Sequence, residues 1–342
     1  MTNILVLYSR LSGYWLSCMR HDFQKNGNNY LVISKSSNPD APFEFQNEEG
    51  ITIIIGDHLR SIDLFEIVNE FNPGLIYISG WSDPRYKKIG TYFKARNIKV
   101  IIGMDNHWLG TSKQVLGSMF SYQLIKKFST HIWIPGLPQL FFAKKLGFEN
   151  KEILKGLYCA DDIKFTNVNQ LVFNRQIIFV GRLVEHKGLN IFFNVLEELI
   201  QSHQINFNVK IIGNGPLKTH IPQHPKIEHV SFVHPEKLPT LFENAGFFIL
   251  PSLYEAWGVA LHEAVIAGMP VISTYQTGAV SEFVLHNHNG YIYDAKKSEQ
   301  LKAILLKINS ISDKEYHQMS KNSKRLSRRL TLDDWSATIN AL

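Results

Sequence analysis

The feature that most constrains the fold of this chain is a repeated alternation of short apolar runs with longer, mixed segments. Helix-length segments such as Leu59–Phe71 and Lys113–Phe128 separate several of the runs in the first half. Runs this short, rich in β-branched residues, are typical of buried strands, and strands that alternate with helices predict a parallel, doubly wound α/β sheet. The expected strands are Ile4–Tyr8, Tyr30–Ser34, Ile51–Ile55, Leu75–Ser79, Val100–Gly103, His131–Ile134 and Ile153–Tyr158.

The same alternation begins again after Asp161–Gln176, a polar stretch without a clear period that we expect to be a linker. With 342 residues the chain is too long for one ordinary core, so two domains are expected. In such sheets the ligand binds beyond the C-terminal ends of the strands. With two domains, we therefore expect the ligand site in the crevice between them. The strands expected here are Ile177–Gly181, Val209–Gly213, Phe247–Leu250, Pro270–Ser273 and Gly290–Tyr293, and the helices are Gly188–Gln201, Leu238–Asn244, Val259–Ala267 and Glu299–Ile308.

Composition narrows the class of protein. A hydrophobic content of 44% is typical of globular proteins, and no apolar run approaches the ~20 residues that span a bilayer. The start of the chain lacks a basic region and a small-residue cleavage site, so we expect no signal peptide. Two cysteines, Cys18 and Cys159, do not form a disulfide framework, and a reduced cytoplasm is the expected location.

The net charge of +6 is unevenly distributed. The segment from Pro84 to Lys145 contains eleven Lys and Arg residues and a single acid, Asp105, and aromatic residues are interleaved with them. These basic residues are either ordinary solvated helix faces or a footprint for anionic lipid headgroups or an acidic acceptor. No signature of a nucleic-acid-binding module is present, so nucleic acid is not an expected partner. The basic residues are Arg85, Lys87, Lys88, Lys94, Arg96, Lys99, Lys113, Lys126, Lys127, Lys144 and Lys145.

The stretch from Leu250 to Gly268 carries the most specific chemical pattern, L-P-S-L-Y-E-A-W-G-V-A-L-H-E-A-V-I-A-G. A buried strand leads into a buried helix through a turn that contains Gly258, and free N–H groups at a helix start suit a phosphate. Glu255 and Glu263 would repel that phosphate unless they accept hydrogen bonds from hydroxyl groups. Phosphate and several hydroxyls together describe a nucleotide sugar. The alternative is that the two glutamates are an ordinary turn residue and a helix residue.

Two other strand ends carry polar turns. Arg182 and Lys187 stand at a helix start, where a fork-shaped donor and a point charge would suit a pyrophosphate. Gly213-Asn214-Gly215-Pro216 lacks the third glycine of a dinucleotide fingerprint and predicts a tight turn that lines a base pocket. No P-loop motif occurs in the chain.

In this order, F-V-G-R-L-x-x-x-K-G, I-G-N-G-P, L-P-S-x-Y-E-A-W-G-V-A-L-H-E-A-x-x-A-G-x-P-V-I-S and T-G-A-V-S-E resemble family-4 retaining glycosyltransferases (glycosyl transferases group 1). The resemblance is confined to the second half. It implies the GT-B fold, in which two Rossmann-like, doubly wound domains face each other across a cleft. The implied domains are an acceptor-side domain at 1–165, a nucleotide-sugar-binding domain at 166–325, and a C-terminal helix at 326–342 that crosses back to the first domain.

The resemblance also implies roles for individual residues. Glu255 would contact the transferred sugar, Glu263 the ribose hydroxyls, and Arg182 with Lys187 the diphosphate. Gly213 to Pro216 and the Phe232–His234 loop would hold the nucleobase. The implied catalytic residues are Asp105, His107, Arg182, Lys187 and Glu255, and the implied donor-binding residues are Gly13, Gly181, Gly213, Asn214, Gly215, Phe232, His234, Trp257, Gly258, Val259, Glu263 and Glu282.

The first half departs from the family pattern. Many members have a Gly-Gly loop after the first strand, whereas Ser9-Arg10-Leu11-Ser12-Gly13 keeps only Gly13. Members often carry a His that faces the reaction centre after the strand that here ends at Gly103. Asp105 is the closer positional match and His107 the closer chemical one, and we favour Asp105 slightly. His107 could instead cap a helix or pack against Trp108.

The implied activity is metal-independent transfer of a hexose-type sugar, with retention, from a nucleotide-diphosphate sugar to a glycan or lipid-linked acceptor. Neither His262-Glu263 nor His286-x-His288 has metal-ligand spacing, and no cofactor is expected. The pathway would be cell-surface polysaccharide or lipopolysaccharide biosynthesis, with the protein cytoplasmic or peripheral on the inner face of the plasma membrane. The alternatives are an inactive donor-binding scaffold and a GT-B-fold epimerase or phosphorylase.

Overall fold

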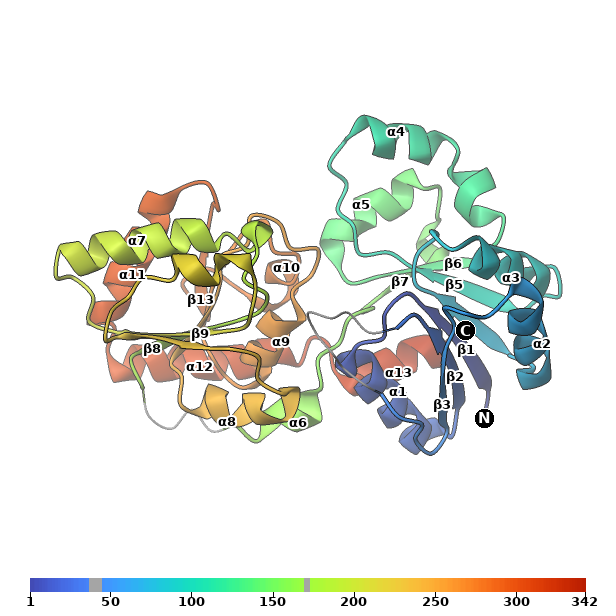
Figure 1. Cartoon of the computed structure of the whole chain (residues 1–342), viewed down its shortest axis with the longest axis horizontal. Helices are drawn as coiled ribbons and strands as arrows, with labels where there is room; N and C mark the ends of the chain where they lie inside the picture. The colour runs from blue at the N-terminus through green and yellow to red at the C-terminus, as the bar shows by residue number, and fades with distance from the viewer. Residues whose placement is uncertain (37–44, 169–172) are drawn as a thin grey trace. The chain divides into compact units, whose positions relative to one another are not determined.

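The computed structural model describes residues 1–36, 45–168 and 173–342. The chain divides into two compact units (Figure 1). The first unit comprises Met1–Cys159 together with Leu332–Leu342, and the second comprises Ala160–Thr331. Each unit contains one parallel sheet with helices packed against it, as the alternation in the sequence predicts.

The sheet of the first unit has the strand order β3-β2-β1-β4-β5-β6-β7, so the order reverses between β1 and β4. All seven expected strands are present, although the last ends at Lys155 and not at Tyr158. The central strands are buried on both faces, as an apolar run in a parallel sheet requires. The strands are β1 (Asn3–Tyr8), β2 (Asn29–Ser34), β3 (Ile51–Ile55), β4 (Leu75–Ile78), β5 (Lys99–Gly103), β6 (His131–Ile134) and β7 (Ile153–Lys155).

One expected helix of this unit is interrupted. Lys113–Phe128 was expected to be continuous, but the helix ends at Met119 and a π-helical turn follows at Tyr122–Lys126. The interruption buries Ile125 and Phe128 in the core, while the helix before it has no buried residue. The helices of the unit are α1 (Gly13–Asn26), α2 (Ser61–Phe71), α3 (Pro84–Lys94), α4 (Ser112–Met119), α5 (Leu137–Lys145) and α13 (Leu332–Asn340).

The C-terminal helix α13 packs beside α1 in the first unit (Figure 1). A buried carboxylate, Asp22, joins the two helices because it accepts hydrogen bonds from Ser336 Oγ at 2.6 Å and Asn340 Nδ2 at 2.7 Å. Burial alone would raise the pKa of Asp22, but hydrogen bonds from Ser336, Tyr30, Asn28 and Asn26 lower it. The side chain of Asp22 is therefore an ionised anchor for the end of the chain.

The sheet of the second unit has the order β10-β9-β8-β11-β12-β13 and reverses between β8 and β11. Its strands are β8 (Gln176–Val180), β9 (Asn208–Ile212), β10 (Ile227–Val230), β11 (Phe247–Leu250), β12 (Val271–Thr274) and β13 (Gly290–Tyr293). Strand β10 was not expected, because it is a half-buried edge strand with Glu228 and His229 at its centre and shows no apolar run.

The stretch Asp161–Gln176, expected to be a linker, contains a helix, so that expectation was wrong in part. Phe165 of this helix, α6, is buried with its ring centroid 5.5 Å from that of Phe242. Polar residues flank Phe165 in the sequence and conceal its burial, and residues 169–172 lie outside the described residues. The helices of the second unit are α6 (Asp162–Thr166), α7 (Leu189–Gln201), α8 (Leu238–Glu243), α9 (Val259–Ile266), α10 (Val280–Phe283), α11 (Ser298–Ser310) and α12 (Asp313–Ser327).

Candidate functional site

In the second unit, the turns that follow β8 and β9 are in direct backbone contact. Leu183 N donates a hydrogen bond to the Asn214 carbonyl at 2.8 Å. Gly213 has φ +139°, and a Cβ at this position would lie 1.9 Å from the carbonyl oxygen of Gly181. Only glycine fits there, because a side chain would strain the backbone and collide with the neighbouring turn. The two turns therefore lie together at the C-terminal ends of β8 and β9, and Arg182 of the first turn is exposed there.

The turn after β11 leads into helix α9 through Gly258, which has φ +104°. No side chain caps this helix, so its start carries the partial positive charge of an uncapped N-terminus. Gly258 and Val259 are partly exposed. These backbone groups therefore offer a site at which an anion would be stabilised.

Lys187 and Glu255 form an ion pair at this edge of the sheet. Glu255 also accepts a hydrogen bond from Ser252 Oγ at 3.3 Å. The carbonyl of His186 accepts from Leu253 N at 2.9 Å and from Tyr254 N at 3.3 Å, which ties the turn after β8 to the turn after β11. The structure thus brings together two of the residues expected from the sequence to be catalytic.

Glu263 lies one turn into α9, on the side where α6 packs. The pKa of its carboxyl is raised to about 7, because burial raises it strongly, Lys164 lowers it and Asp161 raises it. Within the described residues its carboxylate has no hydrogen-bond donor, in contrast to Asp22. Glu263 is therefore poised to gain stability from a ligand that donates hydrogen bonds.

The other expected donor-binding residues differ in exposure. Phe232 and His234 follow β10 and are exposed. Glu282 lies in α10, and its backbone carbonyl accepts a hydrogen bond from Arg329 Nη1 at 2.7 Å. Trp257 is only 2% exposed and packs with its ring centroid 6.0 Å from that of Phe283. The indole of Trp257 therefore packs within the turn, and its contact with the donor stays a prediction.

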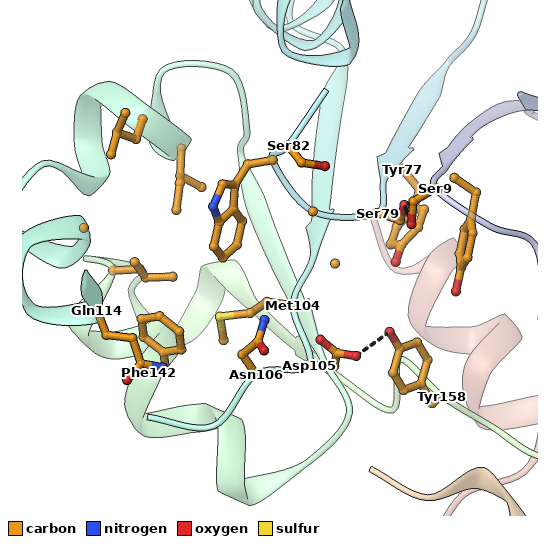
Figure 2. Close-up of a pocket in the computed structure, with 18 of the residues that line it drawn as sticks. Ser9, Tyr77, Ser79, Ser82, Met104, Asp105, Asn106, Gln114, Phe142 and Tyr158 are labelled. Carbon is orange, nitrogen blue, oxygen red and sulfur yellow. Dashed lines mark hydrogen bonds between the residues drawn. The ribbon is translucent and has the colours of Figure 1, made fainter. Parts of the chain in front are cut away.

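In the first unit, a pocket of about 790 Å³ lies beyond the C-terminal ends of β1, β4 and β5, where the strand order reverses (Figure 2). Asp105 lines this pocket, and its Oδ2 accepts a hydrogen bond from the Tyr158 hydroxyl at 3.2 Å. His107 is not among the lining residues; its carbonyl accepts from Gln114 Nε2 at 2.7 Å. Of the two candidates for the end of this strand, Asp105 is the one that faces the pocket.

The polar lining of this pocket includes four tyrosines that the sequence did not single out: Tyr8, Tyr14, Tyr77 and Tyr158. Burial raises the pKa of each, that of Tyr14 to about 12, so all four are neutral hydroxyl groups at pH 7. Three of them, Tyr8, Tyr77 and Tyr158, lie within strands that were expected from the sequence. Gly13, an expected donor-binding residue, begins α1 without lining the pocket, and a Cβ there would meet nothing within 4 Å.

In the described parts of the chain, no group of three or more His, Cys, Asp or Glu side chains is arranged to hold a metal ion. Over the same residues, no helix combines the length and the apolar character needed to cross a bilayer.

Comparison with known proteins places the chain in a class. The fold is that of the GT-B glycosyltransferase structures, shared along the whole chain. Residues 165–326 match the family described as glycosyl transferases group 1.

Two curated relatives and one solved structure illustrate the similarity. An uncharacterized glycosyltransferase of Methanocaldococcus jannaschii is 28% identical over 123 residues, which cover 34% of this chain and 31% of that protein. The amylovoran biosynthesis glycosyltransferase AmsK of Erwinia amylovora is 32% identical over 146 residues, 39% of this chain and 35% of that protein. The chain thus matches about a third of the length of these relatives. Anabaena HepE in complex with UDP-glucose superimposes with a TM-score of 0.73 over 100% of both chains, at 15% identity.

Proposed function

We propose that this protein is a retaining glycosyltransferase that moves a hexose-type sugar from a nucleotide-diphosphate sugar to a glycan or lipid-linked acceptor. The observation that carries the proposal is the Lys187–Glu255 ion pair beside the uncapped start of α9. A cation, a carboxylate and a helix N-terminus at one strand edge match the phosphate and hydroxyl groups of such a donor. The UDP-glucose complex of HepE, which has the same fold, is in keeping with a donor of this class.

In this proposal, breaking the bond between the sugar and the β-phosphate leaves negative charge on the diphosphate. Arg182, Lys187 and the N–H groups at Gly258 and Val259 stabilise that charge without a metal ion. Lys187 exchanges its bond to Glu255 for the diphosphate, which frees the Glu255 carboxylate to contact the sugar. Glu263 accepts hydrogen bonds from the ribose hydroxyls.

The pocket of the first unit is the proposed site of the acceptor. Its tyrosine hydroxyls and Asp105 can donate to and accept from the hydroxyl groups of a sugar. The relative AmsK acts in amylovoran biosynthesis, which supports a role in cell-surface polysaccharide or lipopolysaccharide assembly. We propose that the protein lies in the cytoplasm, where the basic segment Arg85–Lys145 holds it at the inner face of the plasma membrane.

The first test is a panel of UDP-, GDP-, ADP- and dTDP-sugars, scored by thermal stabilisation and by slow release of the nucleotide. A donor at 100 times its Kd should raise Tm by about 5–10 °C. Glu263→Ala should lose this shift, because the ribose hydroxyls lose their acceptor, and Glu243→Ala on the exposed side of α8 should keep it. Unchanged donor affinity in Glu263→Ala would remove the proposed role of that residue.

Other outcomes of the panel would assign a different function. A donor that stabilises the protein but is never turned over, on any acceptor, would mark a donor-binding scaffold. An isomeric product or a requirement for inorganic phosphate would mark an epimerase or a phosphorylase. No response to any donor would contradict the proposal.

A further inference from the structure

The surface of the first unit has a concentration of exposed apolar side chains around α4. Of the sixteen large apolar side chains that are exposed in the described residues, eight lie between residues 109 and 141. Met119 is 71% exposed and Leu116 56% exposed, and no residue of α4 is buried. We call the following side chains the ridge: Leu109, Val115, Leu116, Met119, Phe120 and Leu124.

Helix α4 has two different faces. Gln114 and Gly117 line the pocket that contains Asp105, whereas Leu116 and Met119 belong to the ridge. Helical periodicity places these two pairs on opposite sides of α4. An eight-residue helix with no buried residue gains little from packing and is marginal in water. The outward face of α4 is therefore suited to a partner that covers its apolar side chains.

The segment of the chain that carries the ridge has charges of one sign only. From residue 106 to residue 148 the sequence contains no Asp or Glu. Four lysines in this range are exposed, and one of them, Lys145, lies with its Nζ 5.2 Å from the ring centroid of Phe141. A surface of apolar side chains with cations and no carboxylate is complementary to an anionic, apolar partner. The exposed lysines are Lys113, Lys127, Lys144 and Lys145.

A shallow groove of about 650 Å³ adjoins the ridge and shares Leu124 with it. It is lined by Lys87 and Lys88 of α3 and by Lys127, with aromatic side chains between them, and no acidic residue takes part in the lining. In the described part of the chain, none of these three lysines forms an ion pair. Three unneutralised ammonium groups around one groove would favour a phosphate group.

We propose that the ridge and the lysine groove form a membrane-docking surface, in which the ridge inserts into the headgroup region of an anionic bilayer and the groove takes a lipid phosphate. Insertion removes the ridge side chains from water, and the lysines bind the negative surface. The docking surface is continuous with the pocket that contains Asp105. Helix α4 and Leu124 contribute side chains to the ridge and also line that pocket.

The docking surface also indicates the class of acceptor, a conclusion that rests on the proposed function. Tyrosine hydroxyls and Asp105 lie toward one side of the pocket, and Met104 and Phe142 lie toward the other, next to the amides of Asn106 and Gln114 (Figure 2). Such a pocket fits an amphiphile with a hydroxylated head and an apolar chain. Docking through the ridge would hold the pocket at the membrane surface, and the apolar chain of such an acceptor would lie in that membrane.

The test is co-sedimentation of the full chain with vesicles of phosphatidylcholine, with and without 30 mol% phosphatidylglycerol. We expect at least tenfold stronger binding to the anionic vesicles and a loss of about tenfold in Leu116→Glu. Ile62→Glu is the matched control, because Ile62 on α2 is 60% exposed and lies outside the ridge. Lys88→Glu should weaken binding to anionic vesicles, and Lys314→Glu on α12 should not.

Two outcomes would overturn the docking surface. One is a Leu116→Glu protein that binds like the wild type, and the other is an equal loss of binding in Ile62→Glu. A dimer on size-exclusion chromatography that Leu116→Glu dissociates would assign the ridge to a second copy of the chain instead. Inhibition of vesicle binding by millimolar glycerol phosphate with an intact ridge would assign the groove to soluble phosphates.

The failure of this inference can be distinguished from the failure of the proposed function. Thermal stabilisation by the nucleotide sugar should be the same in the wild type, Leu116→Glu and Ile62→Glu. Vesicle binding without a response to any nucleotide sugar would contradict the glycosyltransferase proposal alone. A response to the donor without vesicle binding would contradict the docking surface and the proposed membrane location, and it would leave the glycosyltransferase proposal standing.

Discussion

The two units of this protein have the same sheet topology and different chemistry at the equivalent strand ends. In both, the strand order reverses next to the first strand, between β1 and β4 in one unit and between β8 and β11 in the other. In the second unit the edge is made of glycine turns, cations and a helix start. In the first unit the lining of the pocket includes four tyrosine hydroxyls and one carboxylate, Asp105, beside Arg10 and Lys113. The topology therefore decides where a site forms, and the residues after each strand decide what it can bind.

The largest expected effect tests the charged edge of the second unit. Lys187→Ala should lower kcat by about two orders of magnitude or more, because the charge on the leaving diphosphate loses a stabilising cation. Steady-state kinetics with the donor identified by the panel would measure this loss. Lys314→Ala, an exposed lysine of α12, is the matched control. Turnover at the wild-type rate in Lys187→Ala would show that the ion pair with Glu255 is only structural.

The second prediction compares a glycine from each unit. Gly213→Ala should destabilise the protein by about 2–4 kcal/mol, because its Cβ would collide with the Gly181 carbonyl at a backbone conformation that favours glycine. Gly13→Ala should change stability by less than about 0.5 kcal/mol, since its Cβ meets nothing within 4 Å. Urea denaturation measures the free energy of unfolding of both variants. Equal losses in the two would contradict the difference in packing between the two strand ends.

The third prediction uses two buried carboxyl groups with opposite pKa shifts. Hydrogen bonds lower the pKa of Asp22, so its stabilising effect is present above its unfolded pKa of 3.8 and is lost in acid. Burial raises the pKa of Glu263 to about 7, so the stability linked to it is present below its unfolded pKa of 4.5 and is lost as the pH rises through 7.

The corresponding variants should therefore move in opposite directions. At pH 8, Asp22→Asn should cost about 2–4 kcal/mol, because five hydrogen-bond donors lose their anionic acceptor. Glu263→Gln should be more stable than the wild type by about 1–2 kcal/mol at pH 8, and this gain should disappear at pH 5. Denaturation curves at the two pH values test both, and a gain for Glu263→Gln that is independent of pH would exclude titration as its cause.

The smallest expected effect concerns the pocket of the first unit. Asp105→Asn should lower transfer to the acceptor by about tenfold, an effect of about 1.4 kcal/mol, because a carboxylate that lines the pocket becomes a neutral amide. Donor-induced thermal stabilisation should stay unchanged. His107→Ala, which replaces a residue outside the lining, is the control, and a larger loss in that variant would reverse the assignment.

Much of the fold was predictable because parallel strands that are buried on both faces leave continuous apolar runs in the sequence. All seven strands of the first unit were expected, and so were the strands of the second unit except β10. Edge strand β10 is half-buried and mixed in composition, and α6 depends on the burial of Phe165 in a polar stretch. Neither has a local pattern, because their stability comes from neighbours distant in the sequence.

The sequence by itself determined the class of fold and the contents of the donor-side motifs, since the glycines, Arg182, Lys187 and the two glutamates are adjacent to strands along the chain. Only the tertiary structure decided which side chains meet. The Lys187–Glu255 pair joins residues 68 positions apart, and the pocket of the first unit gathers Tyr8, Tyr77, Asp105 and Tyr158 from four different segments. The order of strands in a sheet brings such segments together, and that order is a result of packing the whole sheet, which no local stretch of sequence encodes.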